Sequence, residues 1–328
     1  MTKTPQPILV EYAGDTVEVQ YLDDYAEFFM GAVAIFYGPR KSGKTTTVKN
    51  IMFHLQREFG FIWLYSPNHK LNNDFGTIVP KPLIHTTLNI NKLKIILSRQ
   101  TKLVEKYQLS TSKLDKMYEL TKEEDSDDKL KILEKAFSHD MEKVNKLKTK
   151  YKRKIVKKNS YMITDKSLLC YCENLFINPN ILVILDDASM ELSSLLEAKD
   201  NDTKDTLRNI FFEGRHKRIT IFFIIHDVTS ILPPKYRKNS DIHIFCDKEM
   251  VHSWFGCASH TIDKETKKKA YAIANTIFKD RNNKSRKLIF HKGLRKYFYM
   301  DTVYDLPKFE MCSGILKRYC DSIEKQDG

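Results

Sequence analysis

Five nearly uninterrupted apolar runs are spaced along the chain. A run of this kind, without polar alternation, is typical of a strand that is covered on both faces. The runs lie in AVAIFY (32–37), FIWLYSP (61–67), NILVILDDAS (180–189), ITIFFIIHD (219–227) and DIHIFCD (241–247). Between the first two, residues 44–58 carry helical spacing. The pattern predicts an α/β fold with a central, mainly parallel sheet.

Residues 92–160 follow a different pattern, in which apolar positions recur every three or four residues on either side of the acidic break KEEDSDDK (122–129). This spacing predicts a helical hairpin inserted into the sheet domain. Its last stretch, KLKTKYKRKIVKK (146–158), is densely basic. Such a stretch is compatible with a solvated helix face or with a nucleic-acid contact.

Residues 251–328 predict a small C-terminal α+β extension. We expect a helix at 263–277, a basic loop KDRNNKSRK (279–287), a hairpin through LIFHKGLRKYFYM (288–300) and a C-terminal helix. The expected domain boundaries are 1–91 and 161–250 for the two parts of the sheet domain, 92–160 for the hairpin and 251–328 for the extension.

The formal net charge of +13, with a pI near 9.2, indicates a polyanionic partner, either nucleic acid or an anionic membrane surface. All apolar runs are far shorter than the roughly 20 residues of a membrane-spanning helix, so we expect no membrane span. The first residues, MTKTPQPILVEYAGD, lack the apolar core of a signal peptide. We therefore expect a protein that is not secreted and whose six cysteines are thiols.

A phosphate-binding loop is predicted directly after the first apolar run. Gly38-x-x-x-x-Gly43-Lys44-Thr45 follows an expected strand and opens an expected helix, which is the context that this motif requires. Lys44 is expected to reach the β and γ oxygens of ATP, and the Thr45 hydroxyl to ligate Mg²⁺. The residues expected to cradle the phosphates are Gly38, Pro39, Arg40, Lys41, Ser42, Gly43, Lys44, Thr45 and Thr46.

Two adjacent carboxylates, Asp186 and Asp187, stand where a buried strand is expected to end, the usual place for a ligand site in an open α/β sheet. We assign Asp186 to the Mg²⁺ shell and Asp187 to the polarisation of the attacking water. The alternative is that the pair caps the next turn. That arrangement would leave two like charges side by side without a cation.

His226 ends the next apolar run, at a position from which its side chain could sense the γ-phosphate or the water. The alternative is a structural histidine. Just upstream, EGRHKR (213–218) offers Arg215 and Arg218. An arginine that completes the site of a neighbouring subunit is worth ~10³ to 10⁵ in turnover in well-studied phosphoryl-transfer systems.

A zinc site is suggested only weakly by His243-x-x-Cys246 and Cys257-x-x-His260. The first pair lies within an expected strand, where residues three apart face opposite sides of the sheet. We therefore do not expect zinc.

These blocks together resemble the poxvirus-type genome-packaging ATPases of large double-stranded DNA viruses, a branch of the HerA/FtsK group of P-loop NTPases. The resemblance spans residues 31–247, interrupted by the hairpin, and rests on the order of its blocks. Its most specific part is Gly-Arg-His (214–216) ahead of one strand and Pro-x-x-x-Arg-x-Asn (233–239) after it. The blocks are GPRKSGKTT (38–46), FIWLYSPN (61–68), LVILDDAS (182–189), FFEGRHKRITIFFIIHD (211–227) and LPPKYRKNSDIHIFC (232–246).

The resemblance implies a RecA-like sheet, a homo-oligomeric ring around double-stranded DNA, a capsid or portal-vertex partner, and a place in the virion or the host-cell cytoplasm. It further implies ATP hydrolysis coupled to moving a viral genome into the capsid. The residues that match the motifs of this family are Lys44 and Thr45 in the nucleotide loop, Asp186 and Asp187 in the acidic pair and Arg215 in the arginine motif. Relatives commonly carry glutamine where this chain has His226.

The leading hypothesis is therefore a Mg²⁺-dependent ATPase that translocates DNA, with the basic hairpin end and the basic loop (279–287) contacting phosphates. One alternative is a nucleoside or nucleotide kinase, which also begins with a P-loop. Another is a non-catalytic nucleic-acid-binding virion protein, for which the basic charge alone would suffice.

Overall fold

The computed structural model describes residues 5–121, 178–197, 201–228, 236–237, 239–260, 262–280, 283–311 and 320. The chain forms two compact units, Met1–Ser98 with Asn180–Gly328, and Arg99–Pro179. Of the second unit the structure describes 99–121, the later part of helix α4 (Ile90–Thr121), and 178–179. The first unit carries the sheet and all the predicted site residues.

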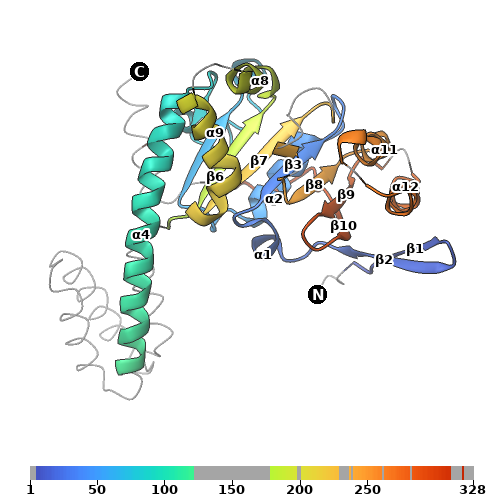
Figure 1. Cartoon of the computed structure of the whole chain (residues 1–328), viewed down its shortest axis with the longest axis horizontal. Helices are drawn as coiled ribbons and strands as arrows, with labels where there is room; N and C mark the ends of the chain where they lie inside the picture. Colours follow the sequence, from blue (N-terminus) through green and yellow to red (C-terminus); the bar gives the residue numbers. More distant parts are fainter. Residues whose placement is uncertain are drawn as a thin grey trace. The chain divides into compact units, whose positions relative to one another are not determined.

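Among the described residues, the sheet of the first unit has ten strands, in the order β1-β2-β10-β9-β8-β3-β7-β6-β4-β5. Figure 1 shows the central strands β8, β3, β7 and β6 side by side. Six neighbouring strands, from β8 to β5, run parallel to one another. The strands are β1 (Ile8–Tyr12), β2 (Asp15–Tyr21), β3 (Val33–Tyr37), β4 (Phe61–Tyr65), β5 (Ile84–His85), β6 (Ile181–Asp186), β7 (Ile219–Ile225), β8 (Ile242–Phe245), β9 (Arg286–His291) and β10 (Lys296–Asp301). The expected central, mainly parallel sheet is confirmed.

The order of the central strands places β7 between β3, which leads into the glycine loop, and β6, which leads into the acidic pair. This is the RecA-like arrangement of P-loop NTPases that the resemblance implied. Because the carboxyl ends of parallel strands meet at one edge of the sheet, the loops after β3, β6 and β7 converge there. The fold thus sets the position of the site.

Helices cover both faces of the sheet. Alternate residues of β3 point to opposite faces: Val33 and Ile35 pack in a cluster with α9, α11 and α12, while Ala34 and Phe36 pack in a cluster with α1 and α2. The helices of the first unit are α1 (Tyr25–Phe29), α2 (Lys44–His54), α3 (His69–Asn72), α8 (Ser189–Glu197), α9 (Asn201–Glu213), α11 (Lys248–Gly256) and α12 (Lys264–Ile277). Burial on both faces explains why the strands are apolar without alternation.

Most predicted elements are found within a few residues of their expected bounds. The helix expected at 44–58 is α2, which ends at His54, and the helix expected at 263–277 is α12. The expected C-terminal hairpin is β9–β10, and it extends the same sheet. The first half of the inserted hairpin is helical, as α4.

The rest of the inserted hairpin, including the basic stretch 146–158, lies outside the described residues, as does most of the expected C-terminal helix. The division of the chain into four segments stays a prediction. In the part of the chain that the structure describes, every helix is too short or too polar to cross a membrane.

Candidate nucleotide site

The glycine loop connects β3 to α2 and depends on its two glycines for different reasons. Gly43 has a φ of 87°, in the left-handed region that favours glycine, and it is the N-cap of α2. A Cβ on Gly38 would lie 2.8 Å from the Cβ of Cys246, so no side chain fits there. The loop therefore keeps its backbone close to the first turn of α2, where N–H groups attract anions. Thr45 and Thr46 lie in that turn and are partly exposed.

Lys44 is buried with its ammonium folded back onto the loop. Its Nζ donates hydrogen bonds to the carbonyl oxygens of Gly38, at 2.6 Å, and Pro39, at 2.9 Å. Burial lowers the pKa of Lys44, while nearby groups, including Asp186 and Asp187, oppose this shift. The ammonium thus sits within the loop, in a place where incoming phosphate oxygens could replace its carbonyl partners.

His226, directly after β7, contacts both the lysine and the acidic pair. Its Nδ1 lies 2.9 Å from Lys44 Nζ, and its Nε2 lies 3.7 Å from Asp187 Oδ1. Burial and the charge of Lys44 lower the pKa of His226, which favours the neutral ring at pH 7. Since Nδ1 accepts from the ammonium, the ring proton is on Nε2 and faces the carboxylate. His226 therefore links the residues assigned to phosphate and to water.

The acidic pair has two distinct environments. Asp186 Oδ2 accepts a hydrogen bond of 3.0 Å from Ser66 Oγ, and burial raises the pKa of Asp186 to about 6. Asp187 accepts one of 3.3 Å from Asn68 Nδ2, and its side chain is more than one-third exposed. Asp187 also has a φ of 52°, an uncommon conformation that aspartate tolerates better than most residues and that clusters at functional sites.

These oxygen ligands suit Mg²⁺. Mg²⁺ in nucleotide sites keeps several waters and is held by one or two carboxylates together with phosphate oxygens. The Asp186 carboxylate, at the end of β6, and the Thr45 hydroxyl, in the first turn of α2, supply the right type of donor. The charge of Lys44 lowers the pKa of Asp186, but burial outweighs it. Among the described residues there is no cluster of three or more His, Cys, Asp or Glu side chains arranged for a metal ion.

Arg215 lies at the other edge of the sheet. Its Cγ is 3.6 Å from the position of a Cβ on Gly31, which precedes β3, whereas the loop follows β3. Arg215 also precedes β7, and His226 follows it. The structure thus brings Lys44, Asp186, Asp187 and His226 together and leaves Arg215 away from them in the same chain.

Arg218 has a local structural role. It adopts a φ of 54°, its carbonyl oxygen accepts from Ile181 N at the start of β6, and its Nη1 donates to Asn180 Oδ1 at 3.4 Å. These contacts fix the turn into β7. Arg218 is therefore no second arginine for its own nucleotide loop.

Part of the basic loop at 279–287 is not available for a DNA contact. Arg286 and Lys287 belong to β9; Arg286 pairs with Asp301 at 3.0 Å, and Lys287 is fully buried. Lys287 Nζ donates to the carbonyl oxygens of Lys284 and, at 3.2 Å, of Ser42 in the glycine loop. The expected DNA contact of Lys287 is wrong, because its ammonium supports the loop from behind.

The residues with zinc-like spacing have other partners. His243 is fully buried, its Nδ1 lies 3.1 Å from Tyr37 Oη, and its Nε2 lies 3.3 Å from Ser240 Oγ. Cys246 packs against Gly38, and His260 Nδ1 lies 2.8 Å from the carbonyl oxygen of Trp254. The histidine and cysteine of the first pair thus serve the sheet core and the loop.

Sequence reasoning missed Ser66, Asn68 and Lys287. Ser66 and Asn68 directly follow the strand at 61–65, so their position at the carboxyl edge was a usable signal. Lys287 gave no comparable signal, because a lysine next to an arginine at the start of a strand is usually exposed.

No family model matches this chain. It is 29% identical to uncharacterized protein B354L of African swine fever virus, isolates Warthog/Namibia/Wart80/1980 and Tick/Malawi/Lil 20-1/1983, over 92% of this chain and 90% of the relative. The relatives of this chain thus include viral proteins that match nearly its whole length.

Similar solved structures include a genome packaging NTPase and a conjugation coupling protein. The genome packaging NTPase B204 from Sulfolobus turreted icosahedral virus 2, in complex with AMP, has a TM-score of 0.38 at 10% identity, over 83% of this chain and 98% of B204. The pCW3 conjugation coupling protein TcpA has a TM-score of 0.35 at 11% identity, over 99% of this chain and 72% of TcpA. A viral genome-packaging NTPase is thus among the similar structures, as the sequence blocks suggested. The fold class follows from the order of the central strands, β8-β3-β7-β6-β4.

Proposed function

We propose that the protein is a Mg²⁺-dependent ATPase that uses hydrolysis to translocate double-stranded DNA, as in the packaging of a viral genome into a capsid. The observation that supports this most is the cluster of Lys44, Asp186, Asp187 and His226 at the carboxyl ends of three adjacent parallel strands. Cleavage of a triphosphate by water requires a lysine that binds phosphate, a carboxylate that can ligate Mg²⁺ and a second carboxylate near the attacking water. Lys44, Asp186 and Asp187 are the candidates for these roles.

In the proposed reaction, the water oxygen forms a bond to the γ-phosphorus and the bond from that phosphorus to the β–γ bridging oxygen breaks. ADP leaves, and Asp187 accepts the proton from the water. Lys44 exchanges its bonds to the Gly38 and Pro39 carbonyls for phosphate oxygens. Asp186 and Thr45 would hold Mg²⁺, which neutralises phosphate charge when bound. His226 connects Lys44 to Asp187 and so senses whether both are engaged.

DNA as the partner is supported by the charge of +13, because a strongly basic protein attracts the phosphate backbone. The position of Arg215 is consistent with a ring, because an arginine so far from its own loop could contribute to hydrolysis only at the site of a neighbouring copy. A viral role is supported by the similarity to a viral protein over nearly the whole chain. The capsid or portal-vertex partner is part of the same proposal.

The test is steady-state ATP hydrolysis with and without duplex DNA, for the native protein, Lys44→Ala and Asp187→Asn. We expect DNA to stimulate the native rate and both variants to lose at least about 10²-fold in turnover, a typical contribution of a positioned acid–base group. The Asp187→Asn protein should still bind ATP, since its carboxylate is assigned to the water. Lys296→Ala, an exposed lysine of β10 outside this cluster, is the matched control for Lys44→Ala.

A Lys44→Ala protein that hydrolysed ATP at the native rate would refute the assigned site. Transfer of labelled γ-phosphate to a nucleoside, with little free phosphate, would instead identify a kinase. ATP binding without hydrolysis, on DNA or off it, would identify a non-catalytic nucleic-acid-binding protein.

A further inference from the structure

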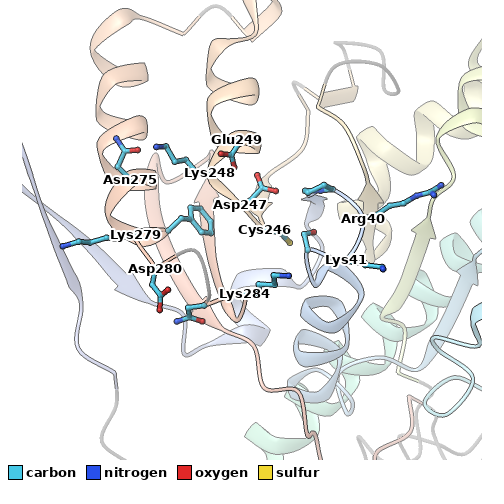
Figure 2. Close-up of a pocket in the computed structure, with 14 residues that line it drawn as sticks. Arg40, Lys41, Cys246, Asp247, Lys248, Glu249, Asn275, Lys279, Asp280 and Lys284 are labelled. Atoms are coloured by element: carbon cyan, nitrogen blue, oxygen red, sulfur yellow. The ribbon is translucent and has the colours of Figure 1, made fainter.

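A cavity of about 670 Å³ opens beside the glycine loop (Figure 2). Its walls come from three parts of the first unit: loop residues 39–42, the end of β8 with the start of α11 (246–249), and the end of α12 with the following residues. This volume is within the range of ligand pockets, about 300–1,000 Å³. No predicted catalytic residue lines it.

The direction of a bound triphosphate follows from the strand order. β7 and β6, which lead to His226 and the acidic pair, lie on one side of β3, and β8 lies on the other. A γ-phosphate placed near Asp187 leaves the α-phosphate and everything attached to it on the β8 side of the loop. The cavity begins on this side, because Cys246 and Asp247 directly follow β8 and line it.

The lining has the chemistry of a nucleoside site. Phe278 lines the cavity and is partly buried against the hydrophobic core, which fixes an aromatic face there. Aromatic faces stack on nucleobases with little dependence on the base. Asn275 is exposed in the wall and carries both an amide donor and a carbonyl acceptor. Figure 2 shows Asn275 and Asp280 across the hollow from Arg40 and Lys41 of the loop.

The cavity is also lined by carboxylates, together with basic residues of the glycine loop. Asp247 and Glu249 line it from the start of α11, and Asp280 lines it from the segment after α12. Carboxylate oxygens accept hydrogen bonds and therefore suit ribose hydroxyls or an exocyclic amine. The cations Arg40 and Lys41 lie at the loop, where the α-phosphate would emerge.

We propose that this cavity binds the nucleobase and ribose of a nucleoside triphosphate, with Phe278 stacking on the base and Asn275 binding its polar edge. The inference deepens the proposed function and rests on a triphosphate occupying the glycine loop. On this proposal, the end of α12 and the residues after it select a nucleotide over free phosphate. These residues lie outside the stretch that resembles the packaging ATPases.

The test is calorimetric binding of two probes to the full-length protein, the imido analogue of ATP and inorganic tripolyphosphate, each with Mg²⁺. Native protein should bind the ATP analogue at least about tenfold more tightly, since stacking on one aromatic ring alone is worth this much. Phe278→Leu, which keeps an apolar side chain against the core, should bind the ATP analogue about tenfold more weakly and tripolyphosphate as before.

Asn275→Ala provides a second variant at an exposed position, where folding is not at risk. This substitution should lower the affinity for the ATP analogue about fivefold, because one hydrogen bond is lost. Its neighbour Thr276 is also exposed but does not line the cavity, so Thr276→Ala should leave both affinities unchanged.

Lys44→Ala separates this inference from the proposed function, because it should lower the affinity for both the ATP analogue and tripolyphosphate. If Phe278→Leu and Asn275→Ala bind the ATP analogue like the native protein while Lys44→Ala does not, the nucleoside assignment is refuted and the phosphate site stands. If Lys44→Ala also binds both probes normally, the phosphate site itself is refuted.

Discussion

Arg215 offers a sharp test because the structure separates it from the site in its own chain. β7 contains seven residues between Arg215 and His226, and at about 3.3 Å per residue this strand spans about 23 Å. An arginine side chain is much shorter than this distance. If Arg215 contributes to hydrolysis, it must therefore act on the site of a neighbouring copy.

The perturbation is a mixture of two variants that are each inactive, Lys44→Ala and Arg215→Ala. Each alone should lose about 10³-fold or more in turnover, if the arginine stabilises the transition state as such residues do. In a random one-to-one mixed ring, about a quarter of the interfaces join a working Lys44 to a neighbour's working Arg215. The mixture should thus recover up to about a quarter of the native rate.

The assay is ATP hydrolysis on duplex DNA, with the two chains co-expressed under different tags so that mixed assemblies can be purified. Co-expression of native protein with Lys44→Ala is the control for subunit mixing. Mixed assemblies with no more activity than the separate variants would refute action on a neighbour. A fully active Arg215→Ala protein would refute the catalytic role altogether.

Three further predictions concern stability and the loop. Gly38→Ala places a methyl group against Cys246, so the free energy of unfolding should fall by about 1–3 kcal/mol in urea denaturation and ATP binding should weaken; unchanged stability and affinity would contradict the packing described. Lys287→Met leaves the Ser42 carbonyl without its buried donor, which should cost about 1–3 kcal/mol by the same measurement, while the exposed Lys296→Met should cost almost nothing. Burial holds the pKa of His243 well below its usual value, so the unfolded chain binds a proton at a higher pH than the folded protein does. The free energy of unfolding should therefore fall below about pH 6.5, by up to about 1.4 kcal/mol per pH unit. The loss between pH 7 and 5.5 should be smaller in His243→Gln, and equal losses would contradict the shift.

The parts predicted well from sequence are those in which local pattern and tertiary role agree. The strands at 181–186 and 219–225 are buried on both faces, so their composition alone identified them. The structure places Gly43 at the start of α2 and Asp186 at the end of β6, as the motif spacing predicted, while their roles stay predictions. The contact between Lys44 and His226 was not predicted, because it depends on β7 lying between β3 and β6.

The parts that were missed depend on distant pairing. The N-terminal hairpin of β1 and β2 has a mixed polar and apolar pattern, and β2 joins the main sheet only through β10, far away in the sequence. Lys287 resembles a surface lysine until β9 pairs with β8 and brings it under the loop. The separation of Arg215 from His226, in contrast, could have been predicted, because the two residues flank one strand.

The hydrogen bond from Lys287 to Ser42 joins positions 245 residues apart, so it has a consequence for biosynthesis. A nascent chain that has emerged only as far as β8 already contains the glycine motif, but it lacks the ammonium that supports the loop from behind. On the proposed function, a chain that has not yet reached β9 would hold nucleotide less firmly than the finished protein, because its loop lacks this hydrogen bond.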